Sequence, residues 1–315
     1  MKREVVTVKR LYSETANSLQ LKLIEGESGL SRIIREPTVN RPGLALAGFT
    51  KYFASKRVQV IGNAESHFMK SLSVRDREER YSVLFRHKMP CLVYCRGFQA
   101  DELLLKAAEK AGVPVFNSSL ITMKFINLAT LAMDFMFAPR SSEIGSMVDI
   151  LGVGVLIRGE SGIGKSECVL ALIDRGYSFV ADDVTRVTLV DGKAVIGTSA
   201  EITRNHMEIR GIGLIDVAAM FGVKSIRHEK QIDLIITLKA WENVPNVERV
   251  GMDDAHRKIL GVNIPQITIP VRPGRDLARL IEVAAFQTKL KRSGRNSAKE
   301  FNDRLIAKMT KESSL

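Results

Sequence analysis

The sequence predicts an α/β protein built from two domains. Its 315 residues are many for a single hydrophobic core. In the first half, apolar strand-like runs alternate with helical patterns, as in a parallel sheet covered by helices. In the second half, an apolar run at residues 153–157 precedes a glycine-rich loop and a helical pattern at 166–174. We expect a linker at 138–142 that separates an amino-terminal domain, 1–137, from a carboxy-terminal domain, 138–315.

In the first domain, residues 58–63 read as a strand and turn, and residues 90–94 as an apolar strand. A helix is predicted over 101–111, closed by Gly112, with a further strand at 113–116. No catalytic constellation occurs in this half, so we expect it to be a scaffold or regulatory domain.

The composition, 45% hydrophobic and 26% charged, is that of an ordinary globular protein. The three cysteines (Cys91, Cys95 and Cys168) lack metal-finger spacing, which favours buried free thiols in a reducing cytoplasm. The long apolar stretch at 120–138 is interrupted by polar residues, so we expect a core or interface helix and no membrane association.

The net charge of +12 is partly due to the carboxy-terminal tail. A solvated helix face ranks first as its explanation, and an acidic or polyphosphate partner is an alternative. Nucleic acid ranks last, because Phe301 is the one aromatic residue among these charges. The cations in question are Lys289, Lys291, Arg292, Arg295, Lys299, Arg304, Lys308 and Lys311.

The glycine-rich loop fits the phosphate-binding pattern G-x-x-x-x-G-K-[ST] at each fixed position. Between a strand and a helix, such a loop aims backbone N–H groups and the positive end of the helix at an anion. Lys165 would reach the outer phosphates, and the Ser166 hydroxyl would bind the accompanying Mg²⁺. A chance glycine-rich turn is the alternative. We therefore predict that a nucleoside triphosphate or related polyphosphate binds to Gly159, Glu160, Ser161, Gly162, Ile163, Gly164, Lys165 and Ser166.

Two carboxylates follow the next predicted strand, 177–181. Adjacent side chains on a strand point to opposite faces, so Asp182 and Asp183 are expected to do different work. One should point toward the phosphates, as a metal-associated group or general base, and the other into a supporting network. An exposed acidic turn is the alternative.

Residues 185–190 and 193–196 flank the turn dipeptide Asp191-Gly192 and predict a hairpin. A hairpin at this point departs from the layout of small GTPases and predicts a mixed sheet. No base-recognition motif of the Asn-Lys-x-Asp type follows it.

Further candidates for the site lie in two later segments. Glu208 and Arg210 are charged residues in an apolar frame, which makes Glu208 a candidate metal ligand and Arg210 a phosphate or carboxylate clamp. A salt-bridged turn between strands competes with this interpretation. Arg272 and Arg275 flank Pro-Gly in a turn suited to gripping an anion, ahead of a helix predicted over 277–289.

These motifs together resemble the bacterial HPr kinase/phosphorylases, and the resemblance spans nearly the whole chain. It implies serine phosphorylation of the phosphocarrier protein HPr from ATP or pyrophosphate, and removal of that phosphate by inorganic phosphate, in the regulation of carbon metabolism. It also implies homohexamers and a catalytic domain related to phosphoenolpyruvate carboxykinase. The segments concerned are 41–49 (RPGLALAGF), 159–167 (GESGIGKSE), Asp182-Asp183, 208–217 (EIRGIGLIDV) and 270–275 (PVRPGR).

The resemblance implies a role for each matching residue. Lys165 would stabilise the transferring phosphoryl group, while Ser166 and Glu208 would hold Mg²⁺. Asp183 would take the seryl proton during phosphorylation and return it during dephosphorylation. Arg249 matches the catalytic arginine of the family. Such a site works mainly by alignment and charge neutralisation, so it can run in both directions.

One departure from the family affects the phosphorylase direction, with which segment 270–275 is associated. The usual His-Gly pair, twenty-one residues before the loop lysine, is Ile144-Gly145 here. Isoleucine neither donates a hydrogen bond nor carries charge, so the histidine's contribution to phosphate binding is missing. The usual aspartate ahead of the catalytic arginine is Glu248.

Two rival functions fit the same loop. A phosphate-loop ATPase or small-molecule kinase would hydrolyse or transfer phosphate without labelling HPr. A non-catalytic nucleotide sensor acting through the basic tail would bind ATP tightly without turnover and retain DNA in a salt-sensitive way.

Overall fold

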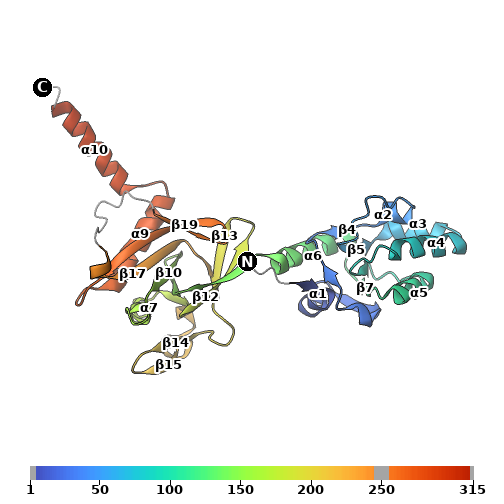
Figure 1. Ribbon diagram of the computed structural model, residues 1–315, viewed down its shortest axis with the longest axis horizontal. Helices are drawn as coiled ribbons and strands as arrows, with labels where there is room; N and C mark the ends of the chain where they lie inside the picture. The colour runs from blue at the N-terminus through green and yellow to red at the C-terminus, as the bar shows by residue number, and fades with distance from the viewer. Residues whose placement is uncertain (1–4, 245–254, 313–315) are drawn as a thin grey trace. The chain divides into compact units, whose positions relative to one another are not determined.

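The computed structural model describes residues 5–244 and 255–312, which form two compact units dividing between Ala138 and Pro139 (Figure 1). Both units combine strands and helices, so the predicted α/β class is confirmed. Within the described ranges, no helix has the length and apolarity required to cross a bilayer.

The amino-terminal unit contains short strands and six helices among its described residues. The strands are β1 (Val6–Thr7), β2 (Leu21–Glu25), β3 (Ile33–Ile34), β4 (Val39–Asn40), β5 (Val58–Ile61), β6 (Leu92–Tyr94) and β7 (Val115–Ser118). The helices are α1 (Val8–Thr15), α2 (Gly43–Leu46), α3 (Asn63–Ser71), α4 (Val74–Phe85), α5 (Glu102–Ala111) and α6 (Thr122–Phe137).

A five-stranded sheet in the order β2-β7-β6-β5-β4 forms the centre of this unit, parallel except for β2. Successive residues of a strand face opposite sides of the sheet. Val93 and Phe116 accordingly pack into the core beneath α1 and α6. Leu92, Tyr94 and Val115 pack into a second core beneath α2 to α5. The unit is therefore a sheet covered by helices on both faces.

The carboxy-terminal unit is richer in strands. Its strands are β8 (Arg140–Ile144), β9 (Ser146–Ile150), β10 (Val153–Gly159), β11 (Ser178–Ala181), β12 (Val184–Val190), β13 (Ala194–Thr198), β14 (His206–Ile209), β15 (Gly213–Asp216), β16 (Glu229–Gln231), β17 (Leu234–Ala240), β18 (His256–Ile259) and β19 (Val262–Val271). Its helices are α7 (Lys165–Asp174), α8 (Val217–Phe221), α9 (Leu277–Arg292) and α10 (Ser297–Glu312).

A six-stranded sheet in the order β11-β9-β10-β17-β19-β18 carries this unit. The pairs β10–β17 and β17–β19 are parallel and the others antiparallel, so the predicted mixed sheet is confirmed. The predicted hairpin is β12–β13, but it belongs to a second sheet, β16-β13-β12-β8. The expected linker is wrong for residues 140–142, because they lie in β8 and pair with β12.

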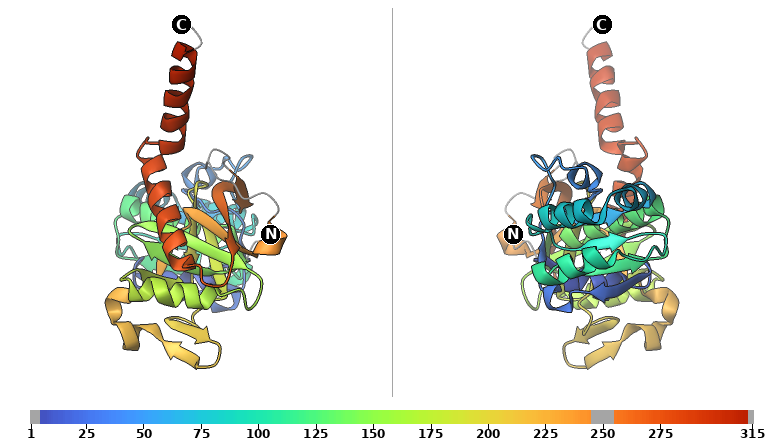
Figure 2. Two further views of the ribbon diagram at one scale, coloured as in Figure 1. Left: turned by 90° about the vertical axis from the view of Figure 1, so that its left-hand side faces the viewer. Right: turned by 90° about the vertical axis from the view of Figure 1, so that its right-hand side faces the viewer.

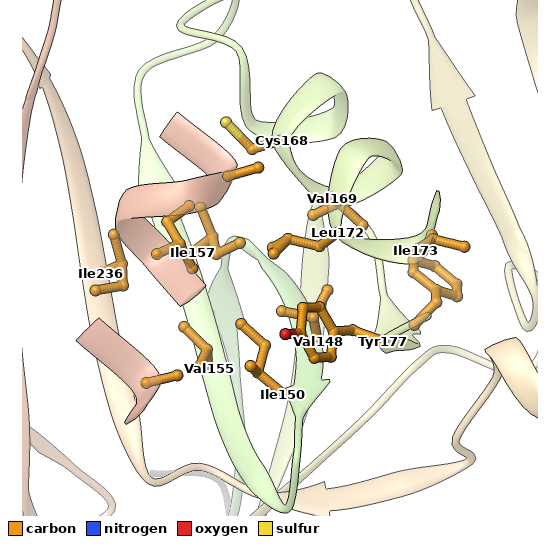
Figure 3. Close-up of a cluster of buried hydrophobic side chains, with 14 of the residues drawn as sticks. Val148, Ile150, Val155, Ile157, Cys168, Val169, Leu172, Ile173, Tyr177 and Ile236 are labelled. Atoms are coloured by element: carbon orange, nitrogen blue, oxygen red, sulfur yellow. The ribbon is translucent and has the colours of Figure 1, made fainter. Parts of the chain in front are cut away.

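Helices α7 and α9 pack together on one face of the six-stranded sheet (Figure 2, left). Figure 3 shows Val169 and Leu172 of α7 among the side chains of the central strands, including Ile157 of β10. The other face packs through Leu156 and its neighbours against Val187 of the second sheet. Strand β10 is thus packed on both faces, and this packing fixes the position of the glycine-rich loop that begins at its end.

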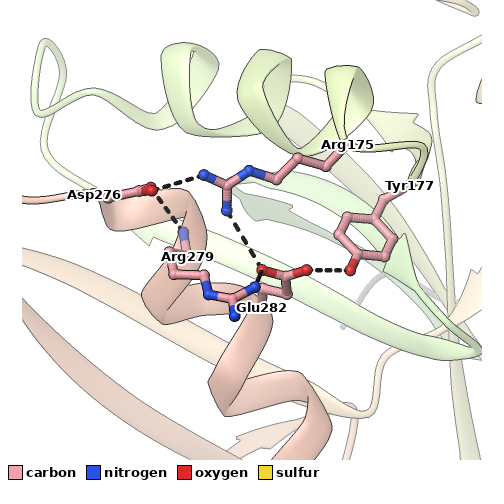
Figure 4. Close-up of polar contacts among 5 residues, drawn as sticks. All are labelled: Arg175, Tyr177, Asp276, Arg279 and Glu282. Carbon is pink, nitrogen blue, oxygen red and sulfur yellow. Dashed lines mark hydrogen bonds and ion pairs between the residues drawn. The ribbon is translucent and has the colours of Figure 1, made fainter.

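A polar network ties the start of α9 to the end of α7 (Figure 4). Glu282 is buried in α9 and accepts a hydrogen bond from the Tyr177 hydroxyl. Its other oxygen lies 2.6 Å from Nη1 of Arg279 and 3.4 Å from Nη1 of Arg175. Arg175 also binds Asp276, the N-cap of α9, at 2.7 Å. These partners satisfy a carboxylate whose burial alone would be unfavourable.

The basic tail is only partly a solvated face. Arg292 pairs at 2.6 Å with Asp233, which is 3% exposed, and Nζ of Lys289 donates to the carbonyl oxygen of Leu151 at 2.8 Å. Because a buried carboxylate needs a partner, Arg292 has a structural role. The expectation of a purely solvated charge run is therefore wrong for these two residues.

We expect Glu282→Gln to destabilise the carboxy-terminal unit in a pH-dependent way. The Tyr177 hydrogen bond, and then Arg279 and Arg175, lower the pKa of Glu282. A lowered folded-state pKa stabilises the fold above the ordinary glutamate pKa of about 4.3 and ceases to do so as the pH falls through the folded value. Urea denaturation followed by the single tryptophan, Trp241, should show the wild-type advantage at pH 7 shrinking on acidification.

The exposed Glu229, changed to Gln, is the matched control and should show no such trend. A wild-type advantage that stays constant down to acid pH would contradict the stabilising role given to the ionised Glu282.

Candidate functional site

The glycine-rich loop connects the buried strand β10 to α7 in the central layer of the carboxy-terminal unit. Gly159 ends the strand at φ +157°, and a Cβ there would lie 2.9 Å from the Leu238 carbonyl oxygen. Gly164 caps α7 at φ +100°. The first N–H groups of a helix have no partner within it, so the loop and helix together offer donors to an anion.

Lys165 is the first residue of α7 and is only 8% exposed. Its Nζ donates to the carbonyl oxygens of Gly159 and Glu160, at 3.1 and 3.0 Å. The ammonium is thereby held against the loop, on the side of the carboxyl end of β10. The positive charge and the helix N-terminus add their fields at one place.

Asp182 and Asp183 occupy the bend between β11 and β12, and their surroundings differ. Asp182 accepts a hydrogen bond of 2.6 Å from the Ser146 hydroxyl and one of 3.2 Å from the Glu208 N–H. Burial raises the pKa of Asp182, against the effect of these hydrogen bonds. Asp183 is exposed, and its carboxylate has no hydrogen bond or ion pair with any described residue. The pair thus divides as predicted into a networked carboxylate and a free one.

The backbone fixes where Asp183 lies. Its φ is +53°, a left-handed conformation that aspartate tolerates better than most residues. Its carbonyl oxygen accepts from the Gly145 N–H at 2.8 Å, and a Cβ on Gly145 would lie 2.6 Å from the Ile157 carbonyl oxygen. β11 runs parallel to β10 with β9 between them, about 10 Å away. Asp183 therefore emerges at the same sheet edge as the loop.

Strand β14 joins the loop to the aspartate bend. Met207 and Ile209 are buried in the core beneath α7, so the alternation of a strand places Glu208 and Arg210 together on the exposed face. Nη2 of Arg210 donates to the Ser161 hydroxyl of the loop at 2.7 Å. The N–H of Glu208 donates to Asp182. One strand thus contacts both parts of the site.

The residues fit a hard cation. The Ser166 hydroxyl lies in the first turn of α7, which packs against β14, and the Glu208 carboxylate makes no hydrogen bond or ion pair with another described residue. Hydroxyl and carboxylate oxygens suit Mg²⁺, which takes few protein ligands and completes its shell with phosphate and water. Among the described residues, no group of three or more His, Cys, Asp or Glu side chains forms a dedicated metal cage.

Three further arginines were predicted to be catalytic or anion-binding residues. Arg249 lies outside the described residues. The guanidinium of Arg272 stacks on the Trp241 ring, 3.5 Å from its centroid, and Nη1 of Arg275 donates to the Pro270 carbonyl oxygen at 3.2 Å. Anion binding by this arginine turn stays a prediction.

Ser146 is the residue that sequence reasoning missed. It is fully buried at the start of β9 and binds Asp182. A hydroxyl in a buried strand needs a hydrogen-bond partner, and this requirement was the available signal. The partner is thirty-six residues away, so the pairing itself could not be read from the sequence.

Fold and site together define a phosphate-loop protein of the nucleotide-binding, phosphoryl-transferring class. A loop before a helix, an ammonium, an exposed aspartate and a free glutamate meet at one edge of a mixed sheet. The chain belongs to the HPr kinase/phosphorylase family. Residues 6–133 match the model for the HPr serine kinase N terminus, and residues 136–305 match that for the HPr serine kinase C-terminal domain.

Individual proteins similar to this chain include two HPr kinase/phosphorylases and one solved structure. The HPr kinase/phosphorylase of Halalkalibacterium halodurans is 42% identical, with 92% of this chain and 95% of the relative aligned. That of Leptospira biflexa is 40% identical, with coverage of 92% and 90%. The solved structure of the Hpr(Ser) kinase/phosphatase from Coxiella burnetii is 36% identical and matches 51% of this chain and 98% of that chain, with a TM-score of 0.46.

We expect Ser146→Ala to destabilise the carboxy-terminal unit by about 1–3 kcal/mol, because it leaves one oxygen of the partly buried Asp182 without its donor. Urea denaturation monitored by Trp241 fluorescence measures the loss. Ser178→Ala is the control. The Ser178 hydroxyl donates an exposed hydrogen bond of 3.2 Å to the Lys224 carbonyl oxygen, and its loss should cost less than about 0.5 kcal/mol. Equal losses of stability from the two changes would show that Ser146 has no special role in holding Asp182.

Proposed function

We propose that this protein transfers a phosphoryl group from ATP or pyrophosphate to a seryl hydroxyl of HPr, and reverses the transfer with inorganic phosphate. The observation that carries the proposal is the bridge formed by β14 and the residue after it: Arg210 contacts the loop, and the Glu208 N–H of β14 contacts the aspartate bend. It relates a polyphosphate-binding loop to a carboxylate suited to act on an incoming alcohol. Family membership supplies the acceptor protein.

In the forward direction, the seryl oxygen attacks the terminal phosphorus of the donor while the bond to the leaving phosphate breaks. The Asp183 carboxylate takes the seryl proton, since it is exposed, unpaired and held by its backbone beside the loop. Lys165 and the loop N–H groups neutralise charge on the transferring group and the leaving oxygens. Arg249, carried over from the family resemblance, would add to that neutralisation.

In the reverse direction, an oxygen of inorganic phosphate attacks the phosphorus of phosphoserine, the seryl oxygen leaves, and pyrophosphate forms. The protonated Asp183 returns its proton to the departing seryl oxygen. The same alignment serves both directions, because the site supplies positions and charge and keeps no covalent intermediate.

Ser166 and Glu208 would hold Mg²⁺, which when bound neutralises part of the charge on the phosphates. We carry over from the family resemblance the assembly into homohexamers. A cytoplasmic location is part of the same proposal, supported by three buried free cysteines, which suit a reducing compartment.

We expect Asp183→Asn to lower the rate of HPr phosphorylation by about 10²–10⁴-fold, because the amide cannot accept the proton. ATP affinity should change less than about threefold, since Asp183 does not belong to the loop. Transfer of label from ATP to purified HPr gives the rate, and equilibrium binding gives the affinity. Equal loss of rate and affinity would give Asp183 a structural or metal-binding role instead.

Asp191→Asn is the matched control for backbone strain. Asp191 also has a positive φ, +50°, but it lies in the β12–β13 hairpin turn. Its substitution should leave transfer unchanged. Release of phosphate from ATP without labelled HPr would favour an ATPase or small-molecule kinase, and tight ATP binding without any turnover would favour a nucleotide sensor.

A further inference from the structure

The amino-terminal unit contains a cavity of about 280 Å³ that phosphoryl transfer does not use. It lies at the carboxyl end of β6, between α3, α4 and the loop that precedes α5. The volume is at the small end of the range for ligand pockets.

The wall of the cavity contains a connected set of polar groups. Asp101, the N-cap of α5, accepts from Nη1 of Arg77 at 2.8 Å and from the Tyr81 hydroxyl at 3.2 Å. The Tyr94 hydroxyl interacts in turn with Tyr81. Burial raises the pKa of both tyrosines, so both hydroxyls remain protonated. These contacts fix the positions of two phenol rings along one side of the cavity.

Two cations at the cavity have hydrogen-bonding capacity left over. Nε of Arg77 is buried and has no partner among the described residues, although its Nη1 is paired with Asp101. Lys70 of α3 is exposed at the cavity and makes no ion pair or hydrogen bond within the described chain. Because Arg77 already offsets the charge of Asp101, Lys70 leaves the lining with a net positive charge.

The remaining lining combines apolar and polar groups. Met69, Ala100 and the edges of the buried Tyr81 and Tyr94 rings supply its apolar part, and Ser66 and Gln99 add further hydrogen-bonding groups. A ligand that satisfies this lining carries an anionic group on a compact body that offers some apolar surface.

We propose that this cavity, lined by Met69, Lys70, Arg77, Tyr81, Tyr94 and Asp101, binds a small organic anion, a carboxylate or phosphate ester on a compact planar or apolar body. The anionic group contacts the Lys70 ammonium and Nε of Arg77, and the body of the ligand lies against Met69 and the tyrosine rings. All of these residues belong to the amino-terminal unit, and none of them belongs to the phosphate loop.

Methyl-resolved NMR of the full chain, labelled with [¹³C-methyl]methionine, tests this site directly. Met69 reports on the cavity, and Met207, buried beside Glu208 in β14, reports on the phosphate loop region. Met69→Leu assigns the first signal. Benzoate and phenyl phosphate are the probes, and benzyl alcohol is the neutral analogue. We expect saturable shifts of Met69 with one or both anions and weaker binding of benzyl alcohol.

Lys70→Gln should weaken binding of the anion at Met69 by about three- to fivefold, as expected for one partly exposed charge contact. Lys124→Gln removes an equally exposed helical lysine from α6, on the opposite face of the sheet, and should have no effect. The proposal is overturned if Met69 stays unperturbed at millimolar probe, if only Met207 shifts, or if benzyl alcohol binds as tightly as the anions.

Discussion

The turn at the end of β10 constrains the rest of the carboxy-terminal unit. A loop that presents backbone N–H groups to a polyphosphate must leave them unpaired, and the surrounding structure has to hold that loop in place. Strand β10, buried from residue 153 to 157 between the parallel β17 and the antiparallel β9, provides that support together with α7, which packs against α9. The Lys165 ammonium is also held in place by the loop, because it donates hydrogen bonds to two loop carbonyl oxygens.

A second feature of the site is that one aspartate stays exposed and unpaired at the same sheet edge as this loop. Asp183 does so because its backbone, rather than its carboxylate, makes the stabilising contact with Gly145. Its neighbour Asp182 takes the hydrogen bonds from Ser146 and the Glu208 N–H. The two adjacent carboxylates therefore lie in different environments. Asp182 belongs to a hydrogen-bond network, and Asp183 stays available for the role that we propose.

The sequence predicted what depends on local pattern and missed what depends on distant pairing. Strand β10, helix α7 and the β12–β13 hairpin follow from apolar periodicity, glycine punctuation and the Asp-Gly turn. The loop residues and both aspartates could be proposed as site residues because the patterns that single them out are local. Ser146 and the Arg210–Ser161 contact were not, since each joins segments separated by tens of residues. Residues 140–142 looked like a linker because short strands resemble loops until their partner β12 is known.

The isoleucine at position 144 limits which groups can serve inorganic phosphate. Ile144 pairs with Val184 at the sheet edge beside Asp183, and its side chain is 69% exposed. The following Gly145 offers no spare backbone donor, because its N–H is already bound to the Asp183 carbonyl oxygen. Neither residue can replace an imidazole donor. On the proposed function, recognition of an attacking phosphate would depend on the loop N–H groups, Lys165 and arginines, the same groups proposed to bind the phosphoryl donor.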